Sequence, residues 1–351
     1  MIPIINFKGQ KIAFAADLIP TAGHVPLPYI PGYDIRPLTS LKEKESRIDE
    51  ELELGIFSVA VYLVLYSDIF EINFSSTQSE AFYNMLYLYL GAAFYCFIAG
   101  QLTKNYSQVD RLWSTIPIVY CWYFTYSSGM DERLILMSTL VSIWGIRLSF
   151  NFARKGGFTL IPWKGAEDYR WEVLQKEIPQ FKDSLNWSLF NFFFICFYQM
   201  GLIFLFSLPI LSAWEGGGEL TYIDFIVGGL MLSLIVIQTI ADEQQHKYQT
   251  KKYSLIKANK VLVGNFKKGF IDTGLWKYSR HPNYTCEQLI WITFYLFSVS
   301  STGKFINWSI IGCLLLVILF YFSAKFSEGI SSKKYTDYKN YQKNTPMFIG
   351  Y

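Results

Sequence analysis

The stretch NFFFICFYQMGLIFLFSLPIL, residues 191–211, contains no charged side chain. A helix that crosses the hydrocarbon core of a bilayer needs about 20 predominantly apolar residues. This stretch has that length, and its neighbours from 186 to 213 extend the pattern. It therefore predicts a membrane-spanning helix, and with it an integral membrane protein.

Further apolar runs lie on both sides of this stretch. Backbone polar groups inside a bilayer have to form their hydrogen bonds within a helix or a closed barrel, so each sufficiently long run predicts a helix. We expect an all-α, polytopic bundle of seven or eight transmembrane helices. The candidate spans are 54–70, 81–99, 112–126, 133–150, 186–213, 222–241, 285–302 and 305–324.

The composition of the whole chain agrees with this prediction. Of its 351 residues, 52% are hydrophobic and only 17% are charged, whereas soluble domains average about 25% charged residues. The net charge of +3 gives no reason to expect a nucleic acid as partner. The five cysteines are widely spaced and there are three histidines, so we predict neither a disulfide framework nor a metal site. We therefore expect membrane lipids to be the molecules that contact most of the surface of the chain.

Lysine and arginine alternate in density along the segments between the predicted spans. Segments 151–186, 242–284 and 325–351 carry six, nine and five of them, whereas 71–80 and 212–221 carry none. Basic loops stay on the cytoplasmic side of a membrane. The alternation favours eight spans with both termini on the basic side. A seven-helix bundle with a re-entrant first segment is the alternative.

Residues 1–53 differ from the rest of the chain. The stretch IPTAGHVPLPYIPGYDIRP, residues 19–37, has five prolines, which favours extended backbone over helix. Residues 40–55 read SLKEKESRIDEELELG and predict a short charged surface helix that Ser40 could cap. We therefore divide the chain into an N-terminal arm, 1–53, and a membrane domain, 54–351. We expect the arm to lie against a partner protein.

Polar side chains collect near the predicted ends of the spans on the basic side. The densest group lies in GLWKYSRHPNYTCEQLIW, residues 274–291, where a helix begins. Helix N-termini bind anions, and an arginine fork binds phosphate or carboxylate. Charged residues at membrane depth are costly, so those in LVSIWGIRLSF and QTIADEQQHKYQ also need a partner or a ligand. The candidate binding residues are Arg147, Asp242, Arg280, His281, Asn283, Tyr284 and Glu287.

Each of these residues also has a structural interpretation. Arg147 lies close to the basic end of its span, so its side chain could reach the interface by snorkelling. The 274–291 segment could be a structural loop cap. The sequence by itself leaves both alternatives open.

The polar segments resemble a known family. GLWKYSRHPNYTCEQLIW is similar to the GLW, RHPNY and GE signature of the proteins grouped as domain of unknown function 1295, which are relatives of the C-terminal domain of steroid 5-alpha-reductases. The resemblance covers roughly residues 100–350 and leaves out the arm. The supporting segments follow in order: VDRLWS (109–114), WGIRLSFNFAR (144–154), EDYRW (167–171), ADEQQHKYQ (241–249) and YTDYKNYQKNTPMFI (335–349).

The resemblance implies a helical, steroid-reductase-like bundle with NADPH bound in a cavity that opens to the cytosolic side. The candidate residues match the family's cofactor-binding pattern by position. In that setting Arg280 and His281 meet phosphates, while Asp242 and Asn283 hold other polar groups of the cofactor. The implied reaction is hydride transfer to a carbon–carbon double bond of a lipid or steroid-like, apolar substrate.

Three positions depart from the family pattern. One is Gly350, which stands where the family has its last proline. Cys286 stands where the family has glycine, and Trp144 stands where steroid reductases have a tyrosine of their proton-donating pair. We therefore assign no catalytic residue. The first expectation is an NADPH-dependent membrane oxidoreductase of the endoplasmic reticulum or the mitochondrial inner membrane. The alternative is an accessory subunit of a larger membrane assembly, such as a mitochondrial respiratory complex. A methyltransferase of the isoprenylcysteine carboxyl type is the third possibility.

Overall fold

The structure is a computed structural model of the 351-residue chain, and it describes residues 6–7, 10–11, 72–158 and 165–349. The chain divides into two compact units, Met1–Leu63 and Val64–Tyr351. In the first unit the described residues form two short antiparallel strands, β1 (Asn6–Phe7) and β2 (Gln10–Lys11). The charged helix predicted at 40–55 and the span predicted at 54–70 lie outside the described residues.

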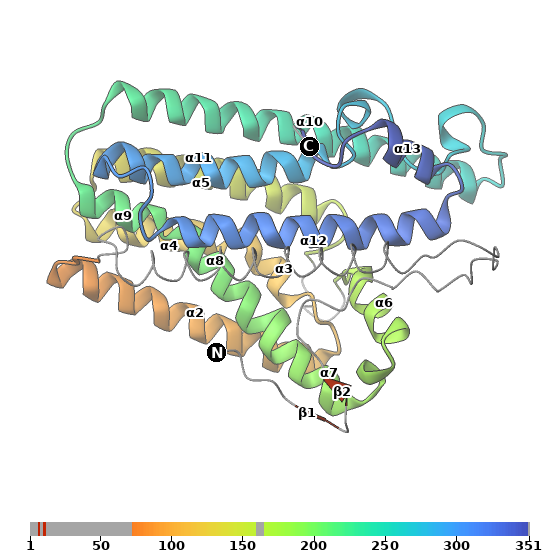
Figure 1. Ribbon diagram of the computed structural model, residues 1–351, viewed down its shortest axis with the longest axis horizontal. Helices are drawn as coiled ribbons and strands as arrows, with labels where there is room; N and C mark the ends of the chain where they lie inside the picture. Colours follow the sequence, from red (N-terminus) through yellow and green to blue (C-terminus); the bar gives the residue numbers. More distant parts are fainter. Residues whose placement is uncertain (1–5, 8–9, 12–71, 159–164, 350–351) are drawn as a thin grey trace, which may run out of the picture. The chain divides into compact units, whose positions relative to one another are not determined.

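The described part of the second unit is a bundle of helices (Figure 1). In chain order, its first six described α-helices are α2 (Ser76–Thr103), α3 (Gln108–Trp113), α4 (Ile116–Ser127), α5 (Glu132–Ala153), α6 (Tyr169–Glu177) and α7 (Ser184–Phe190). Those that follow are α8 (Gln199–Ser207), α9 (Pro209–Gly216), α10 (Tyr222–Lys257), α11 (Pro282–Thr302), α12 (Ile310–Lys334) and α13 (Tyr338–Asn344). A π-helix, η4 (Asn191–Tyr198), joins α7 to α8, and the 3-10 turns are η3 (Pro179–Lys182), η5 (Gly264–Phe266) and η6 (Gly274–Lys277).

Five helical stretches among the described residues are long and apolar enough to cross a membrane. They are α2, α5, the continuous stretch Ser184–Gly216, α10 and α12. The prediction of an all-α, polytopic membrane protein is confirmed. Two further predicted spans correspond to shorter or more polar helices: α4 has only 12 residues, and the 21 residues of α11 begin with the polar sequence PNYTCEQ.

The uncharged stretch 191–211 lies in the interior of the bundle. The apolar window of Ser184–Gly216 is 72% buried, the largest buried share of the five candidate spans. Its first part is η4, whose wider turns place the Cys196 thiol against the Asn191 side chain five residues earlier, with Sγ 3.4 Å from Oδ1. The sequence does not predict this π-helix, because a stretch that is apolar on all sides has no periodic pattern that would distinguish a π-helix from an α-helix.

Close backbone contact joins α8 to α12. Gly312 of α12 lies so near α8 that a Cβ built on it would come within 2.3 Å of the Leu205 carbonyl carbon and the Phe206 nitrogen. Small residues at such crossings are typical of membrane bundles. Gly329, further along the same helix, has nothing within 4 Å of the same atom.

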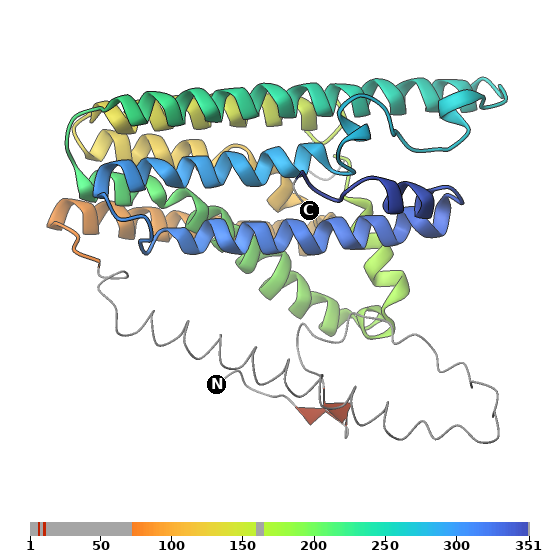
Figure 2. The ribbon, with the colours of Figure 1, turned by 45° about the horizontal axis from the view of Figure 1, so that its top comes forward.

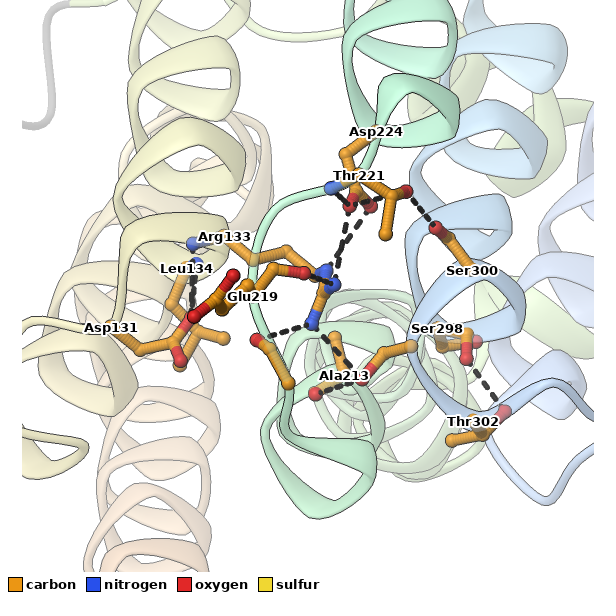
Figure 3. A network of polar contacts seen from close by, with 12 residues as sticks. Asp131, Arg133, Leu134, Ala213, Glu219, Thr221, Asp224, Ser298, Ser300 and Thr302 are labelled. Carbon is orange, nitrogen blue, oxygen red and sulfur yellow. Dashed lines mark hydrogen bonds and ion pairs between the residues drawn. The ribbon is translucent and has the colours of Figure 1, made fainter.

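The short turns lie together at one end of the bundle, and a buried ion pair joins them (Figure 3). Arg133, at the start of α5, donates from Nε and Nη2 to the Asp224 carboxylate in α10 at 3.1 and 3.2 Å. Its remaining N–H groups reach the carbonyls of Gly217 and Glu219, each at 2.6 Å, and the Thr221 amide donates to Asp224 at 2.8 Å. Both charged side chains are at most 2% exposed. We call Arg133 and Asp224 the far-end staple, because they lie opposite the basic loops.

The basic loops emerge at the other end, as the alternation of charge predicts. α10 runs from the staple to this end and continues beyond the neighbouring helices (Figures 1 and 2). Its 36 residues correspond to about 54 Å, which exceeds the roughly 30 Å hydrocarbon core. Asp242 is 20 residues from the start of α10, about 30 Å along the helix. The candidate residues on α10 therefore lie at the basic edge of the membrane core.

Candidate functional site

Four of the predicted residues come together from three helices. Arg147 lies on α5, Asp242 on α10, and Asn283 and Glu287 on the first turns of α11. Arg147 Nη1 lies 2.7 Å from Asp242 Oδ2, and Arg147 Nη2 lies 3.9 Å from Glu287 Oε2. Asn283 Nδ2 donates to the other oxygen of Asp242 at 3.2 Å. The sequence predicts Arg147, Asp242 and Glu287 because charged groups near membrane depth need partners, and Asn283 because it lies at a helix N-terminus. In the structure the four residues are partners of one another.

Three side chains complete the surroundings of Glu287. Gln238 donates from Nε2 to Glu287 Oε2 at 2.5 Å, and the Trp144 indole donates to the same oxygen at 3.1 Å. The Trp291 indole lies 3.4 Å from Oε1. Gln238 was not predicted, although it stands four residues before Asp242 on the same face of an otherwise apolar helix. We call Arg147, Gln238, Asp242, Asn283 and Glu287 the inner cluster.

An aromatic wall leads from the inner cluster into the core. The rings of Trp144 and Trp291 meet edge to face at 4.9 Å, and Trp291 lies 4.1 Å from Phe206 of α8. Trp144 and Trp291 are fully buried. The polar side of the cluster therefore faces the basic edge, and its inner side faces aromatic carbon.

The inner cluster is closely packed yet incompletely paired. Gln238, Asp242 and Glu287 are at most 8% exposed, and the Arg147 side chain is 11% exposed. Four buried atoms have no hydrogen-bond partner: Arg147 Nε, Arg147 Nη2, Gln238 Oε1 and Asn283 Oδ1. Buried polar atoms normally have partners, and an unpaired one costs about 1–3 kcal/mol. Two donors and two acceptors therefore lie close together without a hydrogen-bond partner.

Further cations lie at the basic edge of the cluster. Arg154 binds Glu243 at 2.5 Å and Asn151 Oδ1 at 2.8 Å from Nη2, and its Nη2 also lies 3.4 Å from the Asp242 carbonyl. The Lys155 ammonium is within electrostatic range of Asp242, Arg147 and Arg154. Because these side chains are at the end of α5, they place positive charge where the cluster approaches the basic end of the bundle.

Arg280 and His281 are held in a second group of contacts. Arg280 forms a two-pronged ion pair with Glu328 of α12, with Nε 2.6 Å from Oε1 and Nη2 3.1 Å from Oε2. His281 Nε2 lies 2.9 Å from Oε1 of the same carboxylate, and Gln342 donates to Oε2 at 2.8 Å. Arg280 Nη1 donates to the carbonyls of Gln342 and Thr345. We call these five residues the tail anchor, because Gln342 and Thr345 belong to the C-terminal tail.

Backbone contacts extend the tail anchor along the tail. The amides of Arg280 and His281 donate to the carbonyls of Pro346 and Met347 at 2.9 and 3.2 Å. The Tyr341 hydroxyl donates to the Trp276 carbonyl, and burial raises the pKa of Tyr341, so the hydroxyl stays protonated as this contact requires. The 274–281 segment and the tail therefore fold as one layer.

Tyr284 belongs to the tail side and not to the inner cluster. Its ring stacks on His281 at 5.3 Å and meets Phe320 of α12 edge to face at 4.9 Å. The sequence therefore predicted one group of seven residues, and the structure arranges them as two groups of four and three. Glu328, which joins the second group, was not predicted because an acidic residue near the basic end of α12 looks like an ordinary interfacial one.

Two of the three departures from the family pattern lie beside the inner cluster, and the third, Gly350, lies outside the described residues. Cys286 is buried on α11 between Asn283 and Glu287, and its thiol is within electrostatic range of Arg147 and Asp242. Trp144 satisfies one oxygen of Glu287, as described above. Neither position disrupts the packing of the cluster.

A carboxylate outside the spans is perturbed by its surroundings. Asp110 lies in the short helix α3 next to the loop that precedes α6. Burial, and then the neighbouring Asp168, raise the pKa of Asp110, while Ser107 and Arg170 act in the opposite direction. The proton on Asp110 is therefore bound more tightly in the folded chain than in the unfolded one.

Two open grooves among the described residues lie along the tail and not at the inner cluster. One has a volume of about 460 Å³ and lies between Arg280 and residues 342–347. The other has a volume of about 500 Å³ and lies between Lys268 and α13. In the described ranges no three His, Cys, Asp or Glu side chains are grouped so that they could hold a metal ion.

Comparison with known proteins places the chain among relatives of undetermined activity. A family model described as "Protein of unknown function (DUF1295)" matches residues 96–345. A protein of Schizosaccharomyces pombe (strain 972 / ATCC 24843), described as "Uncharacterized protein C594.04c", is 35% identical over 260 residues. The match covers 70% of this chain and 73% of that protein. No solved structure matches. The family match includes every residue of the inner cluster and of the tail anchor.

Proposed function

The chain belongs to the family described as "Protein of unknown function (DUF1295)", and from that premise we propose that it is an NADPH-dependent membrane oxidoreductase that reduces a carbon–carbon double bond in a lipid or steroid-like substrate. The observation that carries the proposal is the set of four unpaired polar atoms in the inner cluster. We assign the cofactor to this cluster. When bound, NADPH supplies the hydride.

The open atoms fit a primary carboxamide, the group that the nicotinamide ring carries. A carboxamide offers one carbonyl oxygen as acceptor and two N–H donors. Arg147 Nε and Nη2 have no hydrogen-bond acceptor and are available for the oxygen, and the amide oxygens of Gln238 and Asn283 have no donor and are available for the N–H groups. The orientation of both amides is fixed, because their nitrogens donate to the carboxylates of Glu287 and Asp242.

The formal charge of the inner cluster supports the same assignment. Arg147 contributes one positive charge, and Asp242 and Glu287 contribute two negative ones, so their sum is minus one. In surroundings of low dielectric constant such a cluster favours a ligand that becomes more positive as it reacts. A nicotinamide that has given up a hydride carries one positive charge more than before. Asp242 and Glu287 therefore favour the forward direction of the proposed reaction.

The aromatic wall supports an apolar substrate. Trp144, Trp291 and Phe206 offer carbon surface directly beside the polar cluster. Burial of such surface favours an apolar molecule by roughly 25 cal/mol per Å². A lipid or steroid-like compound supplies that surface and is already dissolved in the bilayer around the bundle.

We assign Arg280 and His281 to the tail anchor and not to cofactor phosphates. Glu328 and the tail carbonyls already occupy their donors. Arg154 and Lys155, at the basic edge of the inner cluster, are better placed for anionic groups of a nucleotide. We propose the endoplasmic reticulum or the mitochondrial inner membrane as the location.

Binding of NADPH to the purified chain in lipid nanodiscs tests the proposal. Quenching of tryptophan fluorescence is the readout, since Trp144 and Trp291 adjoin the cluster. Arg147→Gln should weaken binding at least about tenfold, because a charge-assisted hydrogen bond is worth roughly 1.5–3 kcal/mol. Lys333→Gln, which removes an exposed cation of α12, is the matched control. Absence of binding to the unaltered chain, or equal affinity of both variants, would overturn the assignment.

A second candidate, an accessory subunit that keeps the fold in a larger membrane complex, is favoured by how closed the inner cluster is. Each of its charged side chains is at most 11% exposed, and the open grooves described above lie elsewhere. Native electrophoresis after mild detergent extraction separates the candidates. Migration of the 40.7 kDa chain alone supports the oxidoreductase, and migration within a much larger assembly without turnover of any enone supports the subunit.

A further inference from the structure

The second half of α10 and the segment that follows it form a basic projection. Between Gln244 and Ile271 the chain has seven lysines and one histidine but no aspartate or glutamate. α10 ends at Lys257, and Asn259, with a positive φ of 50°, turns the chain back. We call residues 244–271 the basic prong.

The basic prong is a built structure and not a loose loop. The Tyr248 ring stacks on Phe266 at 5.2 Å, and its hydroxyl donates to the Asn265 carbonyl at 3.0 Å. Lys252 is only 4% exposed and donates to the Gly269 carbonyl at 2.8 Å. These contacts hold the returning segment against α10, so the outward side chains have a defined arrangement.

Four lysines of the prong are exposed and form no ion pair with any described residue. The other three are engaged: Lys252 as above, and Lys247 and Lys268 with Glu243 and Asp272. Apolar side chains lie among the exposed ones, with Val261 84% and Val263 67% exposed. The four unpaired lysines are Lys251, Lys257, Lys260 and Lys267.

The length of α10 places this surface beyond the lipid. Lys257 is 15 residues past Asp242, about 22 Å along the helix. The headgroup layer on one side of a bilayer is only about 5–7 Å thick, and a tilt of about 20° shortens the reach by only a few per cent. The tip therefore stands roughly 15 Å outside the headgroups. The tendency of basic loops to stay in the cytoplasm accounts for lysines close to the membrane. It does not account for the exposed Val261 and Val263 at this distance from it.

We propose that the basic prong is the docking surface for an acidic protein partner on the cytoplasmic side. Its unpaired lysines attract carboxylates and steer association. Val261 and Val263 supply the apolar contact that a stable interface needs at its centre. The headgroups of the chain's own membrane are too far from the tip to be the occupant.

Photo-crosslinking in native membranes tests this proposal. The full chain carries p-benzoylphenylalanine in place of Val261, and mass spectrometry identifies the crosslinked peptide. We expect one discrete protein adduct whose crosslinked peptide is rich in aspartate and glutamate. Replacing the four unpaired lysines with glutamine should reduce the adduct at least about fivefold at physiological salt. The matched control replaces four other lysines, two at the end of α12 and two in α13: Lys333, Lys334, Lys339 and Lys343.

Each other outcome overturns the proposal. Adducts to phospholipid indicate a membrane surface, and adducts to a neutral or basic peptide indicate a partner of different chemistry. No adduct, or equal loss in both variants, means that the prong is unoccupied or that charge acts non-specifically. Size-exclusion chromatography confirms that both variants remain folded. The result is independent of NADPH binding, so it stands or falls apart from the proposed function.

Discussion

Removal of the Glu328 carboxylate should release the C-terminal tail. Glu328 accepts hydrogen bonds from Arg280, His281 and Gln342, and it is only 3% exposed. Loss of one partner from a buried ion pair costs about 3–5 kcal/mol, because the other charge stays behind without compensation. In the Glu328→Ala variant this loss lowers the free energy of local unfolding of the tail, residues 338–349, which the tail anchor holds in place.

Limited proteolysis measures this local free energy. Trypsin cuts at Lys339 and Lys343 only after the tail detaches, because a protease needs several unfolded residues around its site. When reclosing is faster than cleavage, the rate follows the population of the open form. A loss of 3 kcal/mol therefore raises the cleavage rate about 150-fold. Glu328→Gln keeps the shape but loses the charge, so its rate should lie in between.

The matched control is Glu177→Gln. Glu177 forms an exposed ion pair with Lys333 at 2.8 Å, and exposed pairs are worth about 0–1 kcal/mol. Its cleavage rate should stay within a few-fold of the unaltered chain. If Glu328→Ala is cleaved no faster than this control, the tail anchor does not hold the tail, and Arg280 is available for another role.

Three further predictions concern the bundle and its loops. Arg133→Met should lower the stability by about 3–5 kcal/mol, since it leaves Asp224 buried and unpaired; thermal unfolding in nanodiscs measures this, and a small shift would contradict it. Burial and a neighbouring carboxylate raise the pKa of Asp110 above its ordinary value of 3.8. The protonated Asp110 therefore stabilises the folded chain fully below pH 3.8, and this stabilisation is lost as the pH rises through the folded-state pKa. Asp110→Asn should remove the corresponding fall in melting temperature with pH, and the same fall in the variant and the unaltered chain would contradict this. Gly312→Ala should cost about 1–3 kcal/mol by forcing α12 away from α8, whereas Gly329→Ala should be neutral or slightly stabilising; equal melting temperatures would refute the close approach.

The sequence contained most of the membrane architecture and half of the site. Long apolar runs can be found because bilayer thickness sets their length, and α2, α5, α10 and α12 follow from them. Charged residues in such runs can be found because they are rare and costly, which led to Arg147 and Asp242. Their mutual pairing could not be found, because it depends on the rotation of α5 relative to α10.

The tail anchor could not be predicted from the sequence for a different reason. Its contacts join residues 280–281 to 328 and to 342–347, and no local pattern announces a hydrogen bond to a distant backbone carbonyl. Arg280 and His281 stand before a helix N-terminus, where an anion is expected. An anion is present, but Glu328 of the same chain supplies it. The expectation that a helix N-terminus binds an anion was therefore correct, but the sequence did not indicate that the anion is a carboxylate of the same chain.

The far-end staple and the inner cluster bind the same two helices at both faces of the membrane. Arg133 holds α5 to Asp224 of α10, and Arg147 holds it to Asp242. Between these points lie 14 residues of α5 and 18 of α10, about 21 and 27 Å of helix. Neither helix can slide along the other without breaking a buried ion pair. The distance between the far-end staple and the inner cluster is therefore fixed. In a bilayer of different thickness the whole bundle has to tilt, because the two helices cannot adjust their lengths separately.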